Sequence, residues 1–592
     1  MHSFSELINK ALFILGDDKK KFYLFIPSFL ILSFLDLIGL SLIAPIVFML
    51  TDNPEVLVNK INELIFSRIG VLVDFKGILI FLSLFIIFIF SLKASFAILI
   101  NKKILEFSWF QRTKLRSYLM MCYQNLPYKD YVKRNTSEFI QMMDTPVGDY
   151  CSGVLTNILR VLGECIICLF IFIFLGVKNF NALFMLLLLY GILFFIYNKY
   201  FIQKVVKYGK NAIKGSVNLH RYVNEGVGGL KEIRILGKEN YFHTNVVESA
   251  KYQARNVVKS QIITLAPKYF VELLLIVFIL LLSSIMAING ESLSVLLSNI
   301  AIFGFAAVRL TPSVNIISTG ITGIKYGSGA TEKIFNEIQD YQKLNIEIDE
   351  PGSFKSVEIN KSKFKKLTLN DVSFKYDSKG SAILENINIS IKKGESIGII
   401  GESGSGKTTL IDLLLGLLPI NEGKILFNDI PLKDNIELWR DKVAYIPQEI
   451  FLIDDTIANN ISLGSDSDSN NRIIKALKAA KLDSFVNSLP NGIKSNIGQN
   501  GIMLSGGQRQ RISLARAFYH DRDVLILDEA TSALDNEIEQ QIIKEVQSLK
   551  NKKTLIIITH RTSSLIECDK IYKIKGGKII KSGNNKIVEK IK

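Results

Sequence analysis

Residues 401–409 read Gly-Glu-Ser-Gly-Ser-Gly-Lys-Thr-Thr. A short apolar run, 396–400, precedes this glycine-rich segment, and an apolar run of helical character, 410–418, follows it. In that context the backbone N–H groups of a glycine-rich turn and the positive end of a helix face phosphate groups. The segment therefore predicts a phosphate-binding loop between a strand and a helix.

Two side chains at the end of this loop fit the same chemistry. The Lys407 ammonium can reach the outer phosphates of a nucleotide, and the Thr408 hydroxyl can bind Mg²⁺. We therefore expect ATP and Mg²⁺ as the cofactors of this part of the chain.

Further motifs follow the loop in a fixed order. They are 504–511 (Leu-Ser-Gly-Gly-Gln-Arg-Gln-Arg), 524–530 (Val-Leu-Ile-Leu-Asp-Glu-Ala), 532–535 (Ser-Ala-Leu-Asp) and 559–561 (Thr-His-Arg). This ordered set resembles the nucleotide-binding domain of ATP-binding-cassette (ABC) transporters. The run Leu-Ser-Gly-Gly-Gln separates that domain from other P-loop ATPases, so the resemblance is specific and implies ATP hydrolysis coupled to transport.

The catalytic residues follow from the resemblance. Asp528 ends the apolar strand 524–527, where a carboxylate faces the ligand crevice, and is expected to hold Mg²⁺. Glu529 is expected to be the general base that polarises the attacking water, and His560 is expected to contact the γ-phosphate. Gln448 is expected to contact Mg²⁺ and to sense the membrane domain.

Tyr376 matches the family's aromatic residue that stacks on adenine, although a lone tyrosine more often serves packing. The expected ATP-binding residues are Tyr376, Gly401, Ser403, Gly404, Gly406, Lys407, Thr408, Thr409, Gln448, Ser505, Gly507 and Gln508, and the expected magnesium ligands are Thr408, Gln448 and Asp528.

The first half of the chain has the composition of a membrane protein. Of the 592 residues 48% are hydrophobic, and they concentrate in long stretches of the first half with few charges. Counting the gaps between charges predicts six spans, because a membrane helix needs ~20 apolar residues. They lie at 21–52, 76–102, 155–177, 179–198, 269–288 and 292–317. The first is too long for a signal-peptide core and is expected to remain as an anchor.

The loops predict the orientation of these spans. The long connections 101–155 and 201–267 are rich in Lys and Arg, which marks them as cytoplasmic, whereas the connections 177–181 and 289–291 are short. An even number of spans places both termini and the ATPase domain on the cytoplasmic side. The formal charge of +16 fits this face and anionic lipid headgroups, and no nucleic-acid-binding module accompanies it. The five cysteines imply no disulfide framework.

The domain organisation resembles that of exporter-type ABC proteins. We expect an α-helical transmembrane domain with six spans at 1–335, a linker at 336–366 and an α/β P-loop ATPase domain at 367–592. In that family the membrane helices extend below the bilayer and short coupling helices dock on the ATPase domains. The matching stretches here are 129–139 and 224–236.

The signature run predicts a dimer. In the family the Ser-Gly-Gly-Gln segment binds the γ-phosphate of ATP held by the other cassette, so one cassette cannot complete a site. The chain has one cassette and six spans, and its motifs, Glu529 included, are intact, which favours a homodimer. In one departure, Gln499 stands where exporters usually carry a Glu before the signature, which leaves the mode of coupling open.

Charges within the spans are candidate substrate contacts, because burying them costs several kcal/mol unless they are paired or solvated. Asp36 and Arg309 qualify best, and for Arg309 a substrate role and a structural pair with Asp36 both remain open. The other intramembrane charges lie nearer the predicted span ends, where snorkelling to the interface explains them. These are Lys93, Arg160, Glu164 and Glu272.

A narrower resemblance concerns the substrate. Segments 34–45 and 308–315 are similar to bacterial lipid-linked oligosaccharide flippases of protein glycosylation, which implies an inner-membrane location and a polyprenyl-pyrophosphate substrate. Arg309 is the candidate partner for the pyrophosphate. That family carries an external amphipathic helix, matched here by 56–69, although an ordinary loop helix fits these residues equally well.

Other functions remain as alternatives. An exporter of lipids, hydrophobic drugs or peptides uses the same scaffold. A soluble ABC ATPase acting on ribosomes or DNA is excluded by the six spans.

Overall fold

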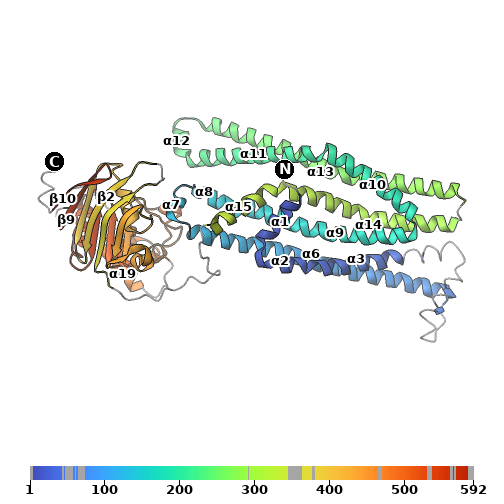
Figure 1. The fold of residues 1–592 in the computed structure, drawn as a ribbon, viewed down its shortest axis with the longest axis horizontal. Coiled ribbons are helices and arrows are strands. Elements are labelled where there is room, and N and C mark those ends of the chain that lie inside the picture. The colour runs from blue at the N-terminus through green and yellow to red at the C-terminus, as the bar shows by residue number, and fades with distance from the viewer. Residues whose placement is uncertain are drawn as a thin grey trace. The chain divides into compact units, whose positions relative to one another are not determined.

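The computed structural model describes residues 4–42, 46, 58–59, 62–63, 74–290, 293–343, 363–376, 380–463, 470–529, 536–559, 565 and 568–583. The chain divides into two compact units, Met1–Asn125 with Asn135–Gly352 and Leu126–Arg134 with Ser353–Lys592. Figure 1 shows the first unit as long helices and the second as sheets with helices packed against them. The predicted external helix at 56–69 lies, apart from 58–59 and 62–63, outside the described residues.

The first unit is entirely helical among its described residues. Its helices are α1 (Phe4–Ile14), α2 (Lys19–Tyr23), α3 (Phe25–Ser41), α6 (Phe75–Gln124), α8 (Thr136–Gly148), α9 (Thr156–Lys178), α10 (Phe180–Tyr200), α11 (Ile202–Gly228), α12 (Leu230–Ile235), α13 (Glu239–Ile288), α14 (Leu293–Tyr326) and α15 (Ser328–Lys343). Six helical segments in the described residues are long and apolar enough to cross a membrane, which confirms the six predicted spans.

Two of the membrane helices are much longer than a bilayer requires. Helices α6 and α13 each contain 50 residues, which at 1.5 Å per residue gives about 75 Å against a hydrocarbon core of about 30 Å. Helix α13 runs beside α11 through the Lys- and Arg-rich part of the sequence. As predicted, the helices continue beyond the apolar stretches into the basic ones.

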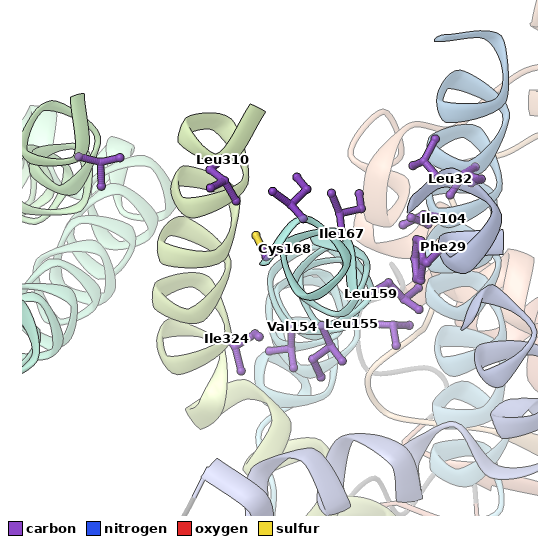
Figure 2. Close-up of a cluster of buried hydrophobic side chains, with 14 of the residues drawn as sticks. Phe29, Leu32, Ile104, Val154, Leu155, Leu159, Ile167, Cys168, Leu310 and Ile324 are labelled. Atoms are coloured by element: carbon purple, nitrogen blue, oxygen red, sulfur yellow. The ribbon is translucent and has the colours of Figure 1, made fainter. Parts of the chain in front are cut away.

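Helix α9 lies at the centre of the membrane unit. Figure 2 shows its side chains Leu159 and Ile167 among residues contributed by α3, α6 and α14. Helix α14 approaches α9 closely, because Gly320 and Gly323 have no side chain at the contact. A Cβ at Gly320 would lie 2.5 Å from the Val161 Cγ2. Small residues at such positions allow two membrane helices to pack by van der Waals contact.

The described residues of the second unit form two sheets. An antiparallel sheet has the order β2-β1-β4-β5, and a six-stranded sheet has the order β10-β9-β3-β8-β7-β6, in which only β10 is antiparallel to its neighbour. The strands are β1 (Lys366–Phe374), β2 (Leu384–Lys392), β3 (Ser396–Gly401), β4 (Glu422–Phe427), β5 (Ile430–Pro431), β6 (Val443–Ile446), β7 (Val524–Asp528), β8 (Thr554–Ile558), β9 (Lys570–Lys575) and β10 (Lys578–Gly583).

The helices of this unit complete an α/β domain, as predicted. They are α7 (Tyr128–Tyr131), α16 (Lys407–Leu414), α17 (Ile436–Arg440), α18 (Ile457–Ser462), α19 (Asn470–Ala479), α20 (Asp483–Ser488), α21 (Gly506–His520) and α22 (Asn536–Gln547). Helix α7 overlaps the predicted coupling stretch 129–139, and its Tyr128 packs against the apolar core that surrounds β1 and β3. Helix α12 lies within the other predicted stretch, 224–236.

The contact between α9 and α14 yields a prediction about stability. We expect Gly320→Leu to destabilise the membrane unit by ~1–3 kcal/mol, because the new side chain overlaps Val161. Gly304→Leu, on the same helix, is the matched control, since a Cβ at Gly304 meets no atom within 4 Å. The thermal unfolding midpoint of the purified protein in detergent measures both effects. Equal midpoints for the two variants would contradict close packing at Gly320.

Candidate functional site

The glycine-rich loop joins the carboxyl end of β3 to the start of α16. Gly404 and Gly406 have left-handed backbones with φ of 78° and 100°, a conformation that glycine adopts without steric cost. Gly401 has no room for a side chain, because a Cβ there would lie 2.5 Å from the Ile574 carbonyl oxygen. The loop therefore has the glycines at the positions where the backbone requires them.

The side chains after this turn differ in exposure. The Lys407 ammonium donates hydrogen bonds of 2.9 Å to the carbonyl oxygens of Gly401 and Glu402, which holds the side chain across the loop. An ammonium has three donors, so one N–H remains for a phosphate oxygen. Thr408 is exposed at the first turn of α16, whereas Thr409 is buried. Thr408 is thus the threonine whose hydroxyl is accessible to a metal ion.

Strand β7 ends at the same edge of the sheet as β3. Parallel pairing of β3 with β8, and of β8 with β7, brings the carboxyl ends of these strands together. Glu529, the residue after β7, has a φ of 49°, which is uncommon for a residue with a side chain. Its backbone N–H donates to the Ile558 carbonyl at 2.9 Å, and its Oε2 accepts a 3.0 Å hydrogen bond from the Gln448 Nε2. Two predicted site residues therefore meet directly.

A group of buried polar side chains lies beside this edge. The Tyr445 hydroxyl donates to the Asp528 Oδ2 at 3.3 Å, and burial raises the pKa of the Asp528 carboxyl. Asp412, on α16, is also buried. Burial, together with the negative charge of Asp528, raises the pKa of the Asp412 carboxyl to about 6. Asp528 and Asp412 thus form an acidic pair that attracts a cation.

The signature residues begin α21. Ser505 is the N-cap of this helix, and its hydroxyl accepts a 3.2 Å bond from the Gln508 N–H, while the Gln508 Oε1 accepts a 2.8 Å bond from the Ser505 N–H. This capping box satisfies two N–H groups at the helix start. Among the described residues no hydrogen bond joins Ser505, Gly507 or Gln508 to the glycine-rich loop.

The remaining predicted nucleotide residues lie elsewhere. Tyr376 packs edge-on against Phe374 with ring centroids 5.0 Å apart, just after β1. Ser403 is exposed in the glycine-rich loop, and Gln499 is exposed before the signature. His560 lies outside the described residues.

The intramembrane charges form a cluster in the first unit. We call Asp36 (α3), Lys93 (α6), Glu164 (α9) and Arg309 (α14) the charge cluster. Arg309 Nε lies 3.1 Å from the Asp36 Oδ2, and Arg309 Nη2 lies 3.4 Å from the Glu164 Oε2. Lys93 pairs with the other oxygen of Asp36. The four charges sum to zero and connect four helices.

The interpretation of Lys93 and Glu164 as snorkelling residues is wrong, because both pair with partners inside the bundle. Opposite charges in neighbouring spans, Asp36 with Lys93 above all, are the signal in the sequence that predicts such pairing. Arg160 and Glu272 are exposed on their helices. For Asp36 and Arg309, the structural pair is the arrangement that is found.

Asp412 and Tyr445 are further site residues that the motif analysis missed. Asp412 is the single charge in the apolar run 410–418, and a carboxylate at such a position indicates a local polar partner. Tyr445 lies three residues before Gln448 on β6 and reaches Asp528 because β6 pairs with β7.

Comparison with known proteins agrees with this geometry. A family model described as "ABC transporter" matches residues 384–532. The "ATP-dependent lipid A-core flippase" of Francisella tularensis subsp. tularensis (strain FSC 198) is 31% identical over 484 residues, covering 80% of this chain and 77% of the relative. The chain belongs to the ABC transporter family.

A second relative and a solved structure are also similar to this ABC half-exporter. The "ATP-dependent lipid A-core flippase" of Legionella pneumophila (strain Lens) is 32% identical over 374 residues, covering 61% of this chain and 60% of the relative. The structure of a bacterial Atm1-family ABC exporter with ATP bound aligns with a TM-score of 0.70 at 18% identity, covering 96% of this chain and 97% of the other. The fold is that of an ABC exporter, with six spans and a cytoplasmic ATPase domain that hydrolyses ATP to drive transport.

The position of Glu529 yields a test of its role as a base. We expect Glu529→Gln to lower ATP hydrolysis by about 10²–10⁴-fold while ATP still binds, since the amide cannot accept the proton of the attacking water. Hydrolysis by the reconstituted protein and binding of a fluorescent ATP analogue measure the two effects. Glu437→Gln, at an exposed glutamate of α17, is the control. Wild-type hydrolysis in Glu529→Gln would remove Glu529 from the catalytic role.

The raised pKa of Asp412 yields a prediction about pH. An acid whose folded-state pKa lies above its unfolded value binds protons more tightly when folded, so its contribution to stability falls as pH rises between about 4 and 6. We therefore expect Asp412→Asn to stabilise the ATPase domain by on the order of 1–3 kcal/mol above pH 6 and little at pH 4. Calorimetric unfolding with EDTA and without nucleotide measures the difference, with the exposed Asp434→Asn as control. A gain that is largest at low pH would contradict this electrostatic account.

Proposed function

We propose that this ABC exporter flips a lipid-linked oligosaccharide or a related polyprenyl-pyrophosphate glycolipid across the bacterial inner membrane. The observation that carries the proposal is Arg309, a guanidinium inside the membrane unit that contacts polar groups of two other helices and Ser313 of its own helix. A guanidinium binds phosphate oxygens bidentately, so it suits a pyrophosphate. Segments 34–45 and 308–315, which resemble flippases of this class, contain Asp36 and Arg309 themselves.

The nucleotide site would work as follows. Thr408, Gln448 and Asp528 would hold Mg²⁺, which neutralises charge on the outer phosphates of ATP. Lys407 and the N–H groups of the loop would bind the phosphates, and Glu529 would accept the proton of the attacking water. The hydrogen bond from Gln448 to Glu529 supports a site in which these two side chains act together.

The functional unit is proposed to be a homodimer. The chain contains one cassette, and Ser505, Gly507 and Gln508 make no hydrogen bond to the glycine-rich loop within the described residues. In the dimer, the signature of one subunit would bind the γ-phosphate held by the other. Moving a two-state equilibrium from 1:99 to 99:1 takes ~5.5 kcal/mol of differential affinity, which two ATP molecules bound between the cassettes could supply.

A second candidate substrate is a phosphorylated lipid without a polyprenyl chain. The relatives from Francisella and Legionella carry the name of flippases for lipid A-core, and they match this chain at 31–32% identity. The same arginine chemistry would serve either substrate. Hydrophobic drugs and peptides remain alternative substrates on the same scaffold, but they carry no phosphate that the Arg309 guanidinium could bind.

A transport assay tests the proposal. Proteoliposomes that contain a fluorescent lipid-linked oligosaccharide should show ATP- and Mg²⁺-dependent movement of the glycan away from the leaflet that faces the ATPase domain. We expect Arg309→Ala to lower this transport by about tenfold with less effect on basal ATP hydrolysis, because a charge-assisted contact to phosphate is lost. Arg160→Ala, at an exposed arginine of α9, is the matched control.

Two outcomes would contradict the proposal. Undiminished transport by Arg309→Ala would remove Arg309 from the substrate site. Transport of a lipid A probe, without any movement of the polyprenyl-linked glycan, would favour the second substrate. Glu529→Gln, which should transport neither, shows that movement depends on hydrolysis.

A further inference from the structure

Groups of the protein already surround the Arg309 guanidinium. Its Nε donates to the Asp36 Oδ2 at 3.1 Å, its Nη1 donates to the Ser313 Oγ at 3.0 Å, and its Nη2 donates to the Glu164 Oε2 at 3.4 Å. Each nitrogen of the guanidinium therefore has a partner. Three of its five N–H donors are thus in use, so a phosphate that engages both the Nη2 and the Ser313 hydroxyl competes with Glu164 for that position.

The two carboxylates that contact Arg309, those of Asp36 and Glu164, differ in their burial and in the number of their contacts. Asp36 has a side-chain exposure of 4%, and both of its oxygens pair with cations, Lys93 at Oδ1 and Arg309 at Oδ2. Glu164 has an exposure of 16%, and only its Oε2 makes contacts, with Arg309 and with the Ser313 hydroxyl at 2.7 Å. Among the described residues, the Glu164 Oε1 has no hydrogen bond or ion pair. Glu164 is therefore the carboxylate that costs less to displace.

The Arg309–Glu164 distance supports this difference. At 3.4 Å the Nη2 to Oε2 contact is longer than the 2.7–2.9 Å typical of a charge-assisted hydrogen bond, whereas the Nε to Oδ2 contact with Asp36 is 3.1 Å. Asp36 also benefits from a second cation, so removing it would leave Lys93 buried without a counter-ion. Loss of Glu164 from Arg309 leaves both cations with Asp36 as counter-ion, and the displaced Glu164 carboxylate, whose side chain is 16% exposed, would be solvated by water or protonated.

We propose that Glu164 is an internal substitute for an anionic ligand: it occupies Arg309 and Ser313 until the phosphate of a lipid substrate replaces it there. Asp36 and Lys93 hold the guanidinium in place throughout the exchange. The proposal rests on the proposed function in requiring a phosphate-bearing substrate, and it assigns to Glu164 and Lys93 opposite effects on substrate affinity.

In the exchange, a phosphate oxygen takes the position of the Glu164 carboxylate oxygen. A phosphate oxygen accepts hydrogen bonds as a carboxylate oxygen does, so it can accept from the Arg309 Nη2 and from the Ser313 hydroxyl in place of the Glu164 Oε2.

The exchange also has a mechanical consequence. Glu164 lies on α9, whereas Arg309 and Ser313 lie on α14, so the contact that breaks is the ionic connection between these two helices. The connection from α14 to α3 through Asp36 remains. Substrate binding would thus release α14 from α9 at this level of the membrane unit without separating it from α3.

The test compares substrate affinity in variants that change one carboxylate or one cation. Stimulation of ATP hydrolysis is measured for the full-length protein in phosphatidylcholine nanodiscs titrated with geranylgeranyl pyrophosphate, and separately with lipid A. Geranylgeraniol, which lacks phosphate, is the matched control ligand. We expect Glu164→Gln to lower the half-saturating concentration by about tenfold, because the competing anion is lost.

Lys93→Met gives an effect of opposite sign. Without the lysine, Asp36 binds only Arg309, so the guanidinium becomes harder to approach and the half-saturating concentration should rise. Arg309→Lys should lose the response to both phosphate ligands. Glu272→Gln, at an exposed glutamate of α13 outside the charge cluster, should behave as the wild type. Size-exclusion chromatography and the unfolding midpoint check that each variant is folded.

The outcomes separate this proposal from the proposed function. If geranylgeranyl pyrophosphate stimulates the wild type and Glu164→Gln at the same concentration, the exchange is refuted while a polyprenyl-pyrophosphate substrate stands. If only lipid A responds and Glu164→Gln shifts its curve, the exchange stands and the polyprenyl assignment fails. Weaker binding in Glu164→Gln, or no response to either phosphate ligand, would overturn the exchange.

Discussion

The parallel pairing of β3, β8 and β7 is the constraint on which the nucleotide site depends. It brings the glycine-rich loop, Asp528 and Glu529 to one edge of the sheet, although more than a hundred residues separate the loop from the carboxylates. The hydrogen bonding between β7 and β8 extends one residue beyond β7, because the Glu529 N–H donates to the Ile558 carbonyl oxygen. Ligand sites at the carboxyl ends of parallel strands are a general property of α/β folds, and here the same edge supplies phosphate donors, cation ligands and a base.

The two units differ in how their buried charges are arranged. At the nucleotide site, burial raises the pKa of both the Asp412 and the Asp528 carboxyl, and a neighbouring negative charge raises it further, Asp528 for Asp412 and Glu529 for Asp528, so a cation is favourable there. In the membrane unit, Asp36 and Arg309 belong to a set of charges that sums to zero, because an unpaired ion in that environment is costly. The carboxyl groups at the nucleotide site therefore favour binding of a cation, whereas the charges in the membrane unit neutralise one another.

Much of this could be predicted from the sequence. The spans were predictable because a bilayer imposes a length of apolar chain, and the site motifs were predictable because phosphate binding demands glycine at fixed positions, as at Gly404 and Gly406. Pairing between distant side chains was not predictable in the same way. Lys93 and Glu164 were interpreted from their distance to the span ends, whereas their partners depend on how α3, α6, α9 and α14 pack. Asp412 was not predicted as a site residue, because it lies on α16 whereas its neighbour Asp528 ends strand β7.

The length of α6 and α13 has a consequence for motion. A helix is stiff along its axis, so a tilt of about 5° around the middle of a ~75 Å helix moves each end by about 3 Å. Small rotations within the bilayer thus become larger displacements far outside it. The two helices differ in how faithfully they transmit such a rotation: α6 contains no proline, whereas α13 carries Pro267 inside it, where a missing backbone hydrogen bond permits bending. We therefore expect α6 to transmit such a rotation along its whole length, whereas α13 can bend at Pro267.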